Sequence, residues 1–278
     1  HDAGDAVQHC LRFGGQPAYA VVRTLLRDYA GIPDSAIPYD DWEAEGRRWL
    51  ASAIVSDAPI TEPTGVDELI GELCESVQFY EWVDERVQQV RMRAVRPVMA
   101  HEITPLTDDA NIIAGSQSIR HEPDHRITQL WVHLHQRDPT KAHDDPHNYT
   151  QIIAAPDLAA QSPEQYGDRR VRRVFGRFLA NRAQVPPLSV RMLARFRDTP
   201  RYLKLALDAK DRQLWAGDVA SVYTRVDTDA SGRIVPRLWQ VISANERRPG
   251  EIYEYELQRF TFLSRYAFIV ADDTLRYP

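Results

Sequence analysis

The sequence predicts an α+β fold in which strands outweigh helices. Three observations predict it: helical periodicity within residues 16–77 and 187–198, period-two alternation across residues 203–257, and Gly-, Pro- and Asp-rich turns between the alternating runs. Of the 278 residues, 43% are hydrophobic. That composition is sufficient for one large or two ordinary domains with apolar cores.

Three amphipathic helices are expected in the first part of the chain. The first spans residues 16–29, the second begins near Asp40 and the third begins near Thr64. Asp40 and Thr64 are predicted N-caps because short polar side chains accept hydrogen bonds from the free amides of a first turn. The third helix has the clearest helical period, with core positions Val66, Leu69, Ile70, Leu73, Cys74 and Val77.

A β-hairpin is expected directly after the third helix. Two runs of alternating residues within 79–95 flank a polar turn at 84–86. The pattern ends at Pro97, which we take as a domain boundary. The predicted division is therefore a smaller α+β domain at residues 1–97 and a β-rich domain at residues 98–278.

The middle of the chain is less regular. Residues 127–135 alternate as a strand, and residues 187–198 have the apolar spacing of a helix. Between them, residues 143–167 are polar and contain several Asp, Pro and Asn residues, which predicts a long loop. Loops of that length are usually functional or reach a neighbouring chain.

Four alternating runs follow near the carboxyl end. Turn residues separate them at 215–218, 227–232 and 248–251, so the prediction is an antiparallel meander. The alternating positions are Leu203, Leu205, Leu207 and Ala209, then Val219, Val222 and Val226, then Leu238, Gln240, Ile242 and Ala244, then Ile252, Tyr253, Tyr255 and Leu257. No obvious nucleophile, general base or phosphate-binding loop accompanies these strands, which favours a protein that acts as a surface.

Charge and composition exclude several classes of protein. The formal net charge of −6 disfavours a sequence-independent nucleic-acid binder, which needs a basic field. No apolar run approaches the roughly 18 residues of a membrane-spanning helix. The two cysteines, Cys10 and Cys74, do not make a disulfide framework. The chain begins at His1, not Met, which suggests a piece of a longer polypeptide.

Residues 121–125 match the zinc-protease motif H-E-x-x-H. In that motif a helix places two histidines one turn apart around a metal ion, with the glutamate beside the bound water. Pro123 disfavours the helix, because proline lacks the amide hydrogen and clashes with the preceding turn. The alternative is a polar turn that leads into a strand. If a catalytic zinc site is present, His121 and His125 are its ligands and Glu122 its base.

Histidines continue beyond this motif. His133 and His135 would share one face of the strand at 127–135, which is a possible ligand pair for a structural metal. His143 and His147 follow in the predicted loop. The favoured interpretation is that these are exposed or interface histidines, which in an assembly would make pH-sensitive contacts.

Aromatic residues in the last strands allow a further possibility. Tyr253, Tyr255, Phe260 and Phe262 could form a platform that binds carbohydrate or a protein partner. Alternating aromatic residues more often belong to the core and to cross-strand pairs. We therefore keep a carbohydrate-binding module as an alternative and favour a structural role for these side chains.

Two blocks of sequence resemble a known family. The first comprises residues 60–70 (ITEPTGVDELI), 79–85 (FYEWVDE) and 90–97 (VRMRAVRP), and the second comprises 166–169 (YGDR), 196–200 (FRDTP), 207–211 (LDAKD), 214–219 (LWAGDV), 239–243 (WQVIS) and 249–250 (PG). Together they resemble the central hub, or tip-attachment, proteins of long-tailed bacteriophages and of gene transfer agents. The likeness covers about two thirds of the chain and its motifs are structural.

This resemblance implies a fold, an assembly and a location. It implies antiparallel tube-like β domains of the barrel or sandwich type, with a smaller α+β domain inserted, here residues 1–97. It implies a homotrimer at the distal end of the phage tail, where the hub caps or extends the tail tube. The implied partners are other tail-tip and tail-tube proteins and fibre or receptor-binding modules, and the implied role is in host attachment and DNA ejection.

Three functions stay open at this point. The favoured one is a structural virion protein in which packed domains shift and no bond is made or broken, so we expect no catalytic residue and no cofactor. The second is a zinc-dependent hydrolase that uses His121, Glu122 and His125. The third is a carbohydrate-binding module. The only metal-ligand candidates are His121, His125, His133 and His135.

Overall fold

The computed structural model describes residues 10–50, 53–57 and 59–261. The chain divides into two compact units, each built from two separate stretches of sequence. Unit 1 comprises residues 1–96 and 122–199, and unit 2 comprises residues 97–121 and 200–278. The chain leaves unit 1 after Arg96, and residues 122–199 return to it, where Phe178 packs in the core of the first stretch.

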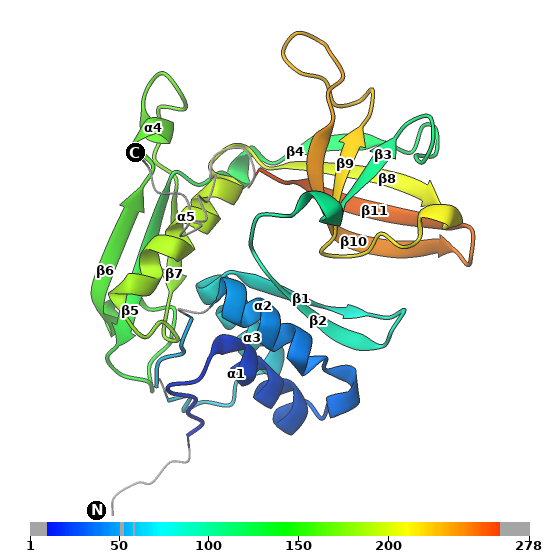
Figure 1. Cartoon of the computed structure of the whole chain (residues 1–278). Helices are drawn as coiled ribbons and strands as arrows, with labels where there is room; N and C mark the ends of the chain where they lie inside the picture. Colours follow the sequence, from blue (N-terminus) through cyan, green and yellow to red (C-terminus); the bar gives the residue numbers. More distant parts are fainter. Residues whose placement is uncertain (1–9, 51–52, 58, 262–278) are drawn as a thin grey trace, which may run out of the picture. The chain divides into compact units, whose positions relative to one another are not determined.

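The first stretch of unit 1 contains the three predicted helices and the predicted hairpin (Figure 1). The helices are α1 (Ala18–Thr24), continued by a π-helical turn at Leu25–Tyr29, α2 (Tyr39–Trp49) and α3 (Val66–Val77). The hairpin strands are β1 (Phe79–Asp84) and β2 (Gln89–Ala94). Their shared core includes Val21, Val22, Leu25, Trp42, Leu69, Ile70, Leu73, Phe79, Val90 and Met92.

Two details of these helices differ from the prediction. The residue before α2 is Pro38 and the residue before α3 is Gly65, and neither helix has a side-chain cap. Asp40 instead lies inside the first turn of α2, where a carboxylate still interacts favourably with the helix dipole. The apolar spacing of residues 16–29 also predicts Tyr29 on the buried stripe of the first helix, but Tyr29 is exposed, because the π-helical turn changes the helical phase.

The second stretch of unit 1 forms a three-stranded sheet with a helix on one face (Figure 1). Its strands are β5 (Gln129–Gln136), β6 (Tyr149–Pro156) and β7 (Val171–Phe175), in the order β6-β5-β7. Helix α5 (Val185–Phe196) covers this face, where its Leu188 and Met192 pack among Leu130, Val132, Leu134 and Val174. The prediction of one long loop at 143–167 is wrong in its middle, where β6 and the short helix α4 (Leu158–Gln161) form.

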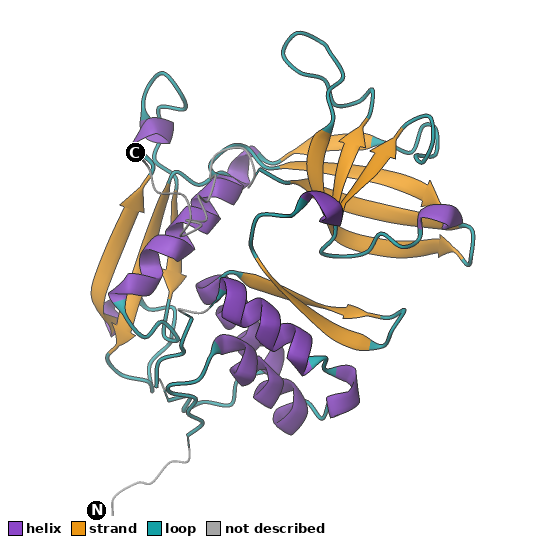
Figure 2. Cartoon of the chain, in the orientation of Figure 1, coloured by secondary structure: helices purple, strands orange, loops and turns teal. Residues whose placement is uncertain are grey.

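Unit 2 contains a six-stranded sheet in the order β3-β9-β10-β11-β8-β4. The strands are β3 (Ile103–Thr107), β4 (Ser118–His121), β8 (Arg201–Asp208), β9 (Val219–Tyr223), β10 (Arg237–Arg248) and β11 (Ile252–Arg259). Short 3₁₀ helices occur across both units at Asp34–Ala36, Ala100–Glu102, Pro123–His125, Pro146–Asn148, Arg182–Gln184 and Ala209–Asp211. In the described chain, strands outweigh helices, as the sequence predicts (Figure 2).

The predicted meander is only partly correct. β9, β10 and β11 are consecutive antiparallel neighbours, and the turns at 227–232 and 248–251 lie between them. β8 pairs with β11 and not with β9, which gives a Greek-key order. The turn at 215–218 therefore leads into β9 without closing a hairpin. The physical reason is the long 209–218 connection, which carries the chain past β10 and β11.

The sheets are mixed, not purely antiparallel. β3 runs parallel to β9, and β7 runs parallel to β5. In unit 2 the two outer strands are β3 and β4, and no pairing between them closes the described strands into a barrel. No helix among the described residues is long and apolar enough to cross a membrane.

Candidate functional site

The H-E-x-x-H residues do not adopt the helix that a zinc-protease site requires. His121 is the last residue of β4, and Pro123–His125 forms a single 3₁₀ turn. His121 and His125 are both exposed. Pro123 occupies the first position of the turn, as its fixed backbone angle favours. The alternative interpretation of a polar turn beside a strand is the one that matches this geometry.

His133 and His135 also fail to form a ligand pair. His133 is buried, with its ring 4.8 Å from that of Phe175 and 5.7 Å from that of Tyr149. His135 is exposed and has a left-handed φ of 59°, which interrupts the alternation of β5. Burial and, to a smaller extent, Arg173 lower the pKa of His133, which favours the neutral form of the imidazole. It serves as a core aromatic residue.

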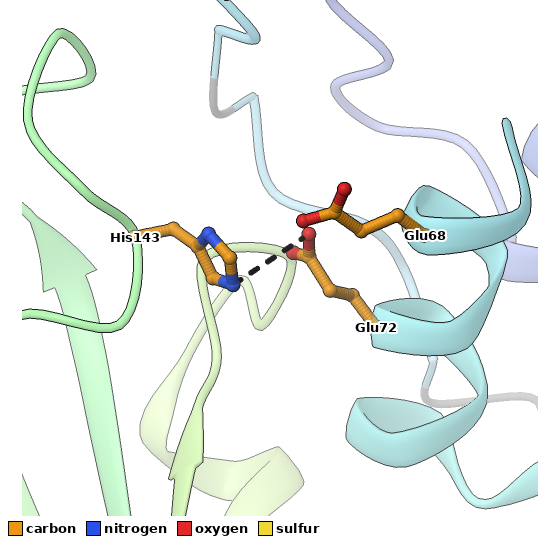
Figure 3. Close-up of side chains that lie close together, drawn as sticks. All are labelled: Glu68, Glu72 and His143. Atoms are coloured by element: carbon orange, nitrogen blue, oxygen red, sulfur yellow. Dashed lines mark ion pairs between the residues drawn. The ribbon is translucent and has the colours of Figure 1, made fainter. Parts of the chain in front are cut away.

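The structure instead brings together three groups that the sequence analysis did not combine: Glu68, Glu72 and His143. Figure 3 shows Glu68 and Glu72 projecting from successive turns of α3 toward His143, which belongs to the loop before β6. One potential ligand atom from each residue lies within 4.8 Å of the other two. His143 Nε2 is 3.9 Å from Glu72 Oε1. Among the described residues this is the one cluster with three groups able to hold a metal ion.

Arg177 already engages one of these carboxylates. Its Nη2 donates to Glu72 Oε1 at 2.7 Å, and its Nε donates to Glu72 Oε2 at 2.8 Å. Burial raises the pKa of Glu72, while Arg177 and His143 oppose that shift. A divalent cation bound to Glu72 would lie close to this guanidinium charge, which disfavours metal binding. The arrangement is better suited to an ion-pair network that joins α3 to the segment after β7.

A second ion pair strengthens the same junction inside unit 1. Arg172 of β7 donates to Glu75 of α3 at 2.6 and 3.0 Å. Both bonds end on Glu75 Oε1, so two donors of one guanidinium hold a single charged oxygen. One side of α3 is therefore tied to the 122–199 stretch through Glu72 and Glu75. Acidic residues at this helical spacing could have been noticed in the sequence, but their arginine partners lie about a hundred residues away and carry no local signal.

The side-chain amide of Asn148 and the hydroxyl of Tyr149 order the loop that carries His143. The Asn148 side chain is buried, and its Nδ2 donates to the carbonyl oxygen of Asp138 at 2.8 Å. Its Oδ1 accepts from the backbone amide of Asp138 at 3.0 Å. The Tyr149 hydroxyl donates to the His143 carbonyl oxygen at 2.7 Å. These bonds hold the loop in one conformation, so His143 is presented to α3 by a defined backbone.

The predicted aromatic platform does not form on the surface of the sheet. Tyr253 and Tyr255 are buried, and Phe260 is half-buried. Phe262 lies outside the described residues. The two tyrosines pair with Leu207 and Leu205 of β8, as expected for cross-strand core contacts. The two tyrosines therefore offer no exposed ring face for carbohydrate stacking.

Comparison with known proteins gives a structural likeness. No protein-family model matches the chain, and no curated protein sequence matches it. A tail protein from Neisseria meningitidis MC58 superposes with a TM-score of 0.55 at 13% identity, over 91% of this chain and 70% of that one. The chain shares the fold of this tail protein.

A second solved structure agrees with the first. A polypeptide from the virion of a native gene transfer agent superposes with a TM-score of 0.58 at 16% identity. The match covers 88% of this chain and 48% of that polypeptide. This chain therefore spans about half the length of the virion polypeptide. At sequence identities of 13% and 16%, these comparisons show a shared fold. They do not transfer the role of either protein to this chain.

Proposed function

We propose that this protein is a structural component of a phage-type tail, and specifically a central hub at its distal end. The observation that carries the proposal is the fold, which is shared over about nine tenths of the chain with a tail protein and with a virion polypeptide of a gene transfer agent. The motifs quoted from the sequence point to the same class of assembly. In this role the protein caps or extends the tail tube as a homotrimer and connects it to fibre or receptor-binding modules.

The surface of unit 1 supports a role in assembly. β6 and β7 are the outer strands of the three-stranded sheet. Outer strands present backbone groups that a neighbouring chain can pair with or cover. Ile152 of β6 is 52% exposed, and Val171 of β7 is 36% exposed. Both side chains lie on edge strands, where an associating subunit could cover them.

The proposed mechanism is mechanical. Two compact units in one chain, each with its own core, are suited to rigid-body movement within a larger particle. In a hub, attachment of a fibre to its receptor shifts these packed units and permits ejection of DNA through the tube. The zinc-hydrolase alternative has little support, because His121 and His125 lack the helical arrangement that the motif requires.

The test is to locate the protein in assembled particles and to remove it. We expect an epitope-tagged chain to label the distal end of the tail, and we expect particles made without the chain to have incomplete tails and to be non-infectious. Mass measurement of the isolated full-length protein should give a trimer. Complete, infectious particles without the chain, or label on the capsid, would contradict the proposal.

A variant separates the hydrolase alternative from the structural role. His125→Ala removes a residue that a zinc hydrolase would need. We expect particles carrying this variant to assemble and infect normally and to contain the same amount of zinc as wild-type particles. Loss of zinc together with loss of a wall-degrading activity would instead support the hydrolase.

A further inference from the structure

Three arginines converge at one end of the sheet in unit 2. Arg237 begins β10, Arg259 ends β11 and Arg201 begins β8. These strands are adjacent, and the register places Trp239 opposite Arg259 and Tyr202 opposite Gln258. The three guanidinium groups therefore occupy neighbouring positions across the strands.

A single carboxylate lies among them. Asp227, from the loop between β9 and β10, is 3% exposed. Its oxygens lie 3.3 Å from Arg259 Nη1, 3.5 Å from Arg237 Nε and 3.7 Å from Arg201 Nη1. One negative charge faces three positive charges, so the cluster keeps an excess of two positive charges. Partly buried charges without compensation are unfavourable, because they lose hydration and repel each other.

The hydrogen-bonding capacity of the arginines is also largely unused. Each guanidinium carries five N–H donors. Within the described residues, Arg259 Nη1 donates to Asp227 and Arg237 Nη2 donates to the carbonyl oxygen of Thr228. Arg237 Nε is buried and has no hydrogen-bond partner there. A buried N–H donor that has no partner among the described residues is suited to an acceptor that comes from outside them.

The residues around the three arginines hold them in place and add to the basic character of this end of the sheet. The guanidinium of Arg259 lies 5.6 Å from the ring centre of the buried Trp239, which holds it in place. Burial, followed by repulsion from Arg237, lowers the pKa of Arg259 to about 10, which remains far above neutral pH. His121 of β4 is opposite Arg201 and extends the same row of basic residues. The three guanidinium groups favour a negative ligand, and Asp227 offsets one of their charges.

We propose that Arg201, Arg237 and Arg259 form a binding site for an oxyanion with two negative charges, the class that includes phosphate and dicarboxylate groups. The planar guanidinium fork matches the oxygen spacing of both groups. A dianion would balance the excess charge left by Asp227 and would accept hydrogen bonds from donors that lack partners among residues 10–261 as the structure describes them. Arg201 is the most exposed of the three arginines and forms the entrance to the site.

The test is to measure anion binding to the full chain by calorimetry and thermal unfolding. Inorganic phosphate and succinate serve as separate probes, with sodium chloride as the reference at the same ionic strength, because screening alone changes stability. We expect at least one probe to bind and to raise the unfolding midpoint above that in chloride. Tighter binding of phosphate would indicate a phosphate group as the ligand, and tighter binding of succinate would indicate carboxylates.

Matched variants assign the effect to this cluster. Arg201→Gln should weaken binding of the effective probe by about tenfold or more, since one charged hydrogen-bond donor is lost. Arg201→Lys keeps the charge without the fork and should fall between Arg201→Gln and wild type. Arg247→Gln is the control, because Arg247 is an exposed arginine of the same sheet that is paired with Glu254. It should bind as wild type does.

Two results would overturn the proposal. The first is an unfolding midpoint that is the same in phosphate, succinate and chloride. The second is equal affinity in wild type, Arg201→Gln and Arg201→Lys. Unfolding midpoints without added anion show whether each variant is folded, and Arg201→Lys gives an answer even if the glutamine variant is not.

Discussion

The stability of unit 1 depends on individual buried residues, of which Arg177 and Glu72 are examples. Their side chains are 7% and 12% exposed, and two hydrogen bonds join them. Loss of one partner from a buried ion pair leaves the other charge without compensation. The pair Arg47–Glu43 on α2 has the same chemistry, but its arginine is 73% exposed. Exposed pairs contribute little, because water and salt screen them.

Arg177→Ala should therefore lower the free energy of unfolding by about 3 kcal/mol. Arg47→Ala, the matched control, should lower it by less than about 0.5 kcal/mol. Denaturant unfolding followed by far-UV circular dichroism measures both. The double variant Arg177→Met with Glu72→Leu should lose less stability than Arg177→Ala, because no charge is left buried. Equal losses in the two single variants would show that burial of the pair is unimportant.

Glu81 on β1 is half-buried, and one oxygen of its carboxylate is shielded from water. Its Oε2 has no hydrogen-bond partner among the described residues, and burial raises its pKa from 4.5 to about 7. The native state therefore holds this proton up to about pH 7, whereas the unfolded chain releases it near pH 4.5. Stability must then fall as pH rises across that window, since the native state binds more protons there.

Glu81→Gln should remove this pH dependence. Near pH 5 the variant and wild type should be about equally stable, and near pH 8 the variant should be more stable by about 1–2 kcal/mol. Thermal unfolding across pH 5–8 gives the difference between the two proteins, which cancels the contribution of other groups. Glu85→Gln, at the exposed turn of the same hairpin, is the control and should follow wild type. A constant difference across the pH range would contradict the raised pKa.

At the scale of elements, the β1–β2 hairpin contains a backbone position suited to glycine. Gln88, in the turn before β2, has a φ of 53° and is exposed. Side chains with a Cβ are strained in this left-handed region by roughly 1–2 kcal/mol, whereas glycine is not. The adjacent Gln89 lies in β2 and does not have a positive φ.

Gln88→Gly should raise the free energy of unfolding by about 0.5–1 kcal/mol, because relief of strain exceeds the added flexibility of the unfolded chain. Gln89→Gly should lower it by a similar amount, since glycine within a strand only adds flexibility. Denaturant midpoints compare the two variants. A loss of stability in both would show that the turn does not need the left-handed conformation.

At the scale of the whole molecule, the two units have separate cores and each is built from two stretches of chain. Units with their own cores often unfold as separate cooperative transitions. Arg177 belongs to unit 1, and the fully buried Leu106 on β3 belongs to unit 2. Substitutions at these two positions therefore report on different units.

Scanning calorimetry should resolve two transitions. Arg177→Ala should lower the midpoint of one, and Leu106→Ala should lower the midpoint of the other, with a destabilisation of roughly 2–5 kcal/mol expected for the buried leucine. A single transition that moves equally in both variants would show that the chain unfolds as one cooperative unit.

Local sequence patterns predict the elements whose signal is local. Helix α3 and the β1–β2 hairpin follow from apolar spacing within about 30 residues, and the alternation of β8, β10 and β11 follows from side chains on two faces of a strand. The two blocks of motifs also predict a tail-protein fold, which the structural likeness supports. β6 was missed because its exposed face carries Ile152 and Ala154, which obscures the alternation.

Contacts between distant segments become visible in the folded structure alone. The pairing of β8 with β11, the return of residues 122–199 to unit 1 and the contact of Arg177 with Glu72 all join segments roughly 50–100 residues apart. Such contacts depend on which buried surfaces and charges fit each other after the elements have formed. Local periodicity carries no information about that choice, so His121 and His125 matched a motif whose helix does not form, while Arg201, Arg237 and Arg259 came together without any motif.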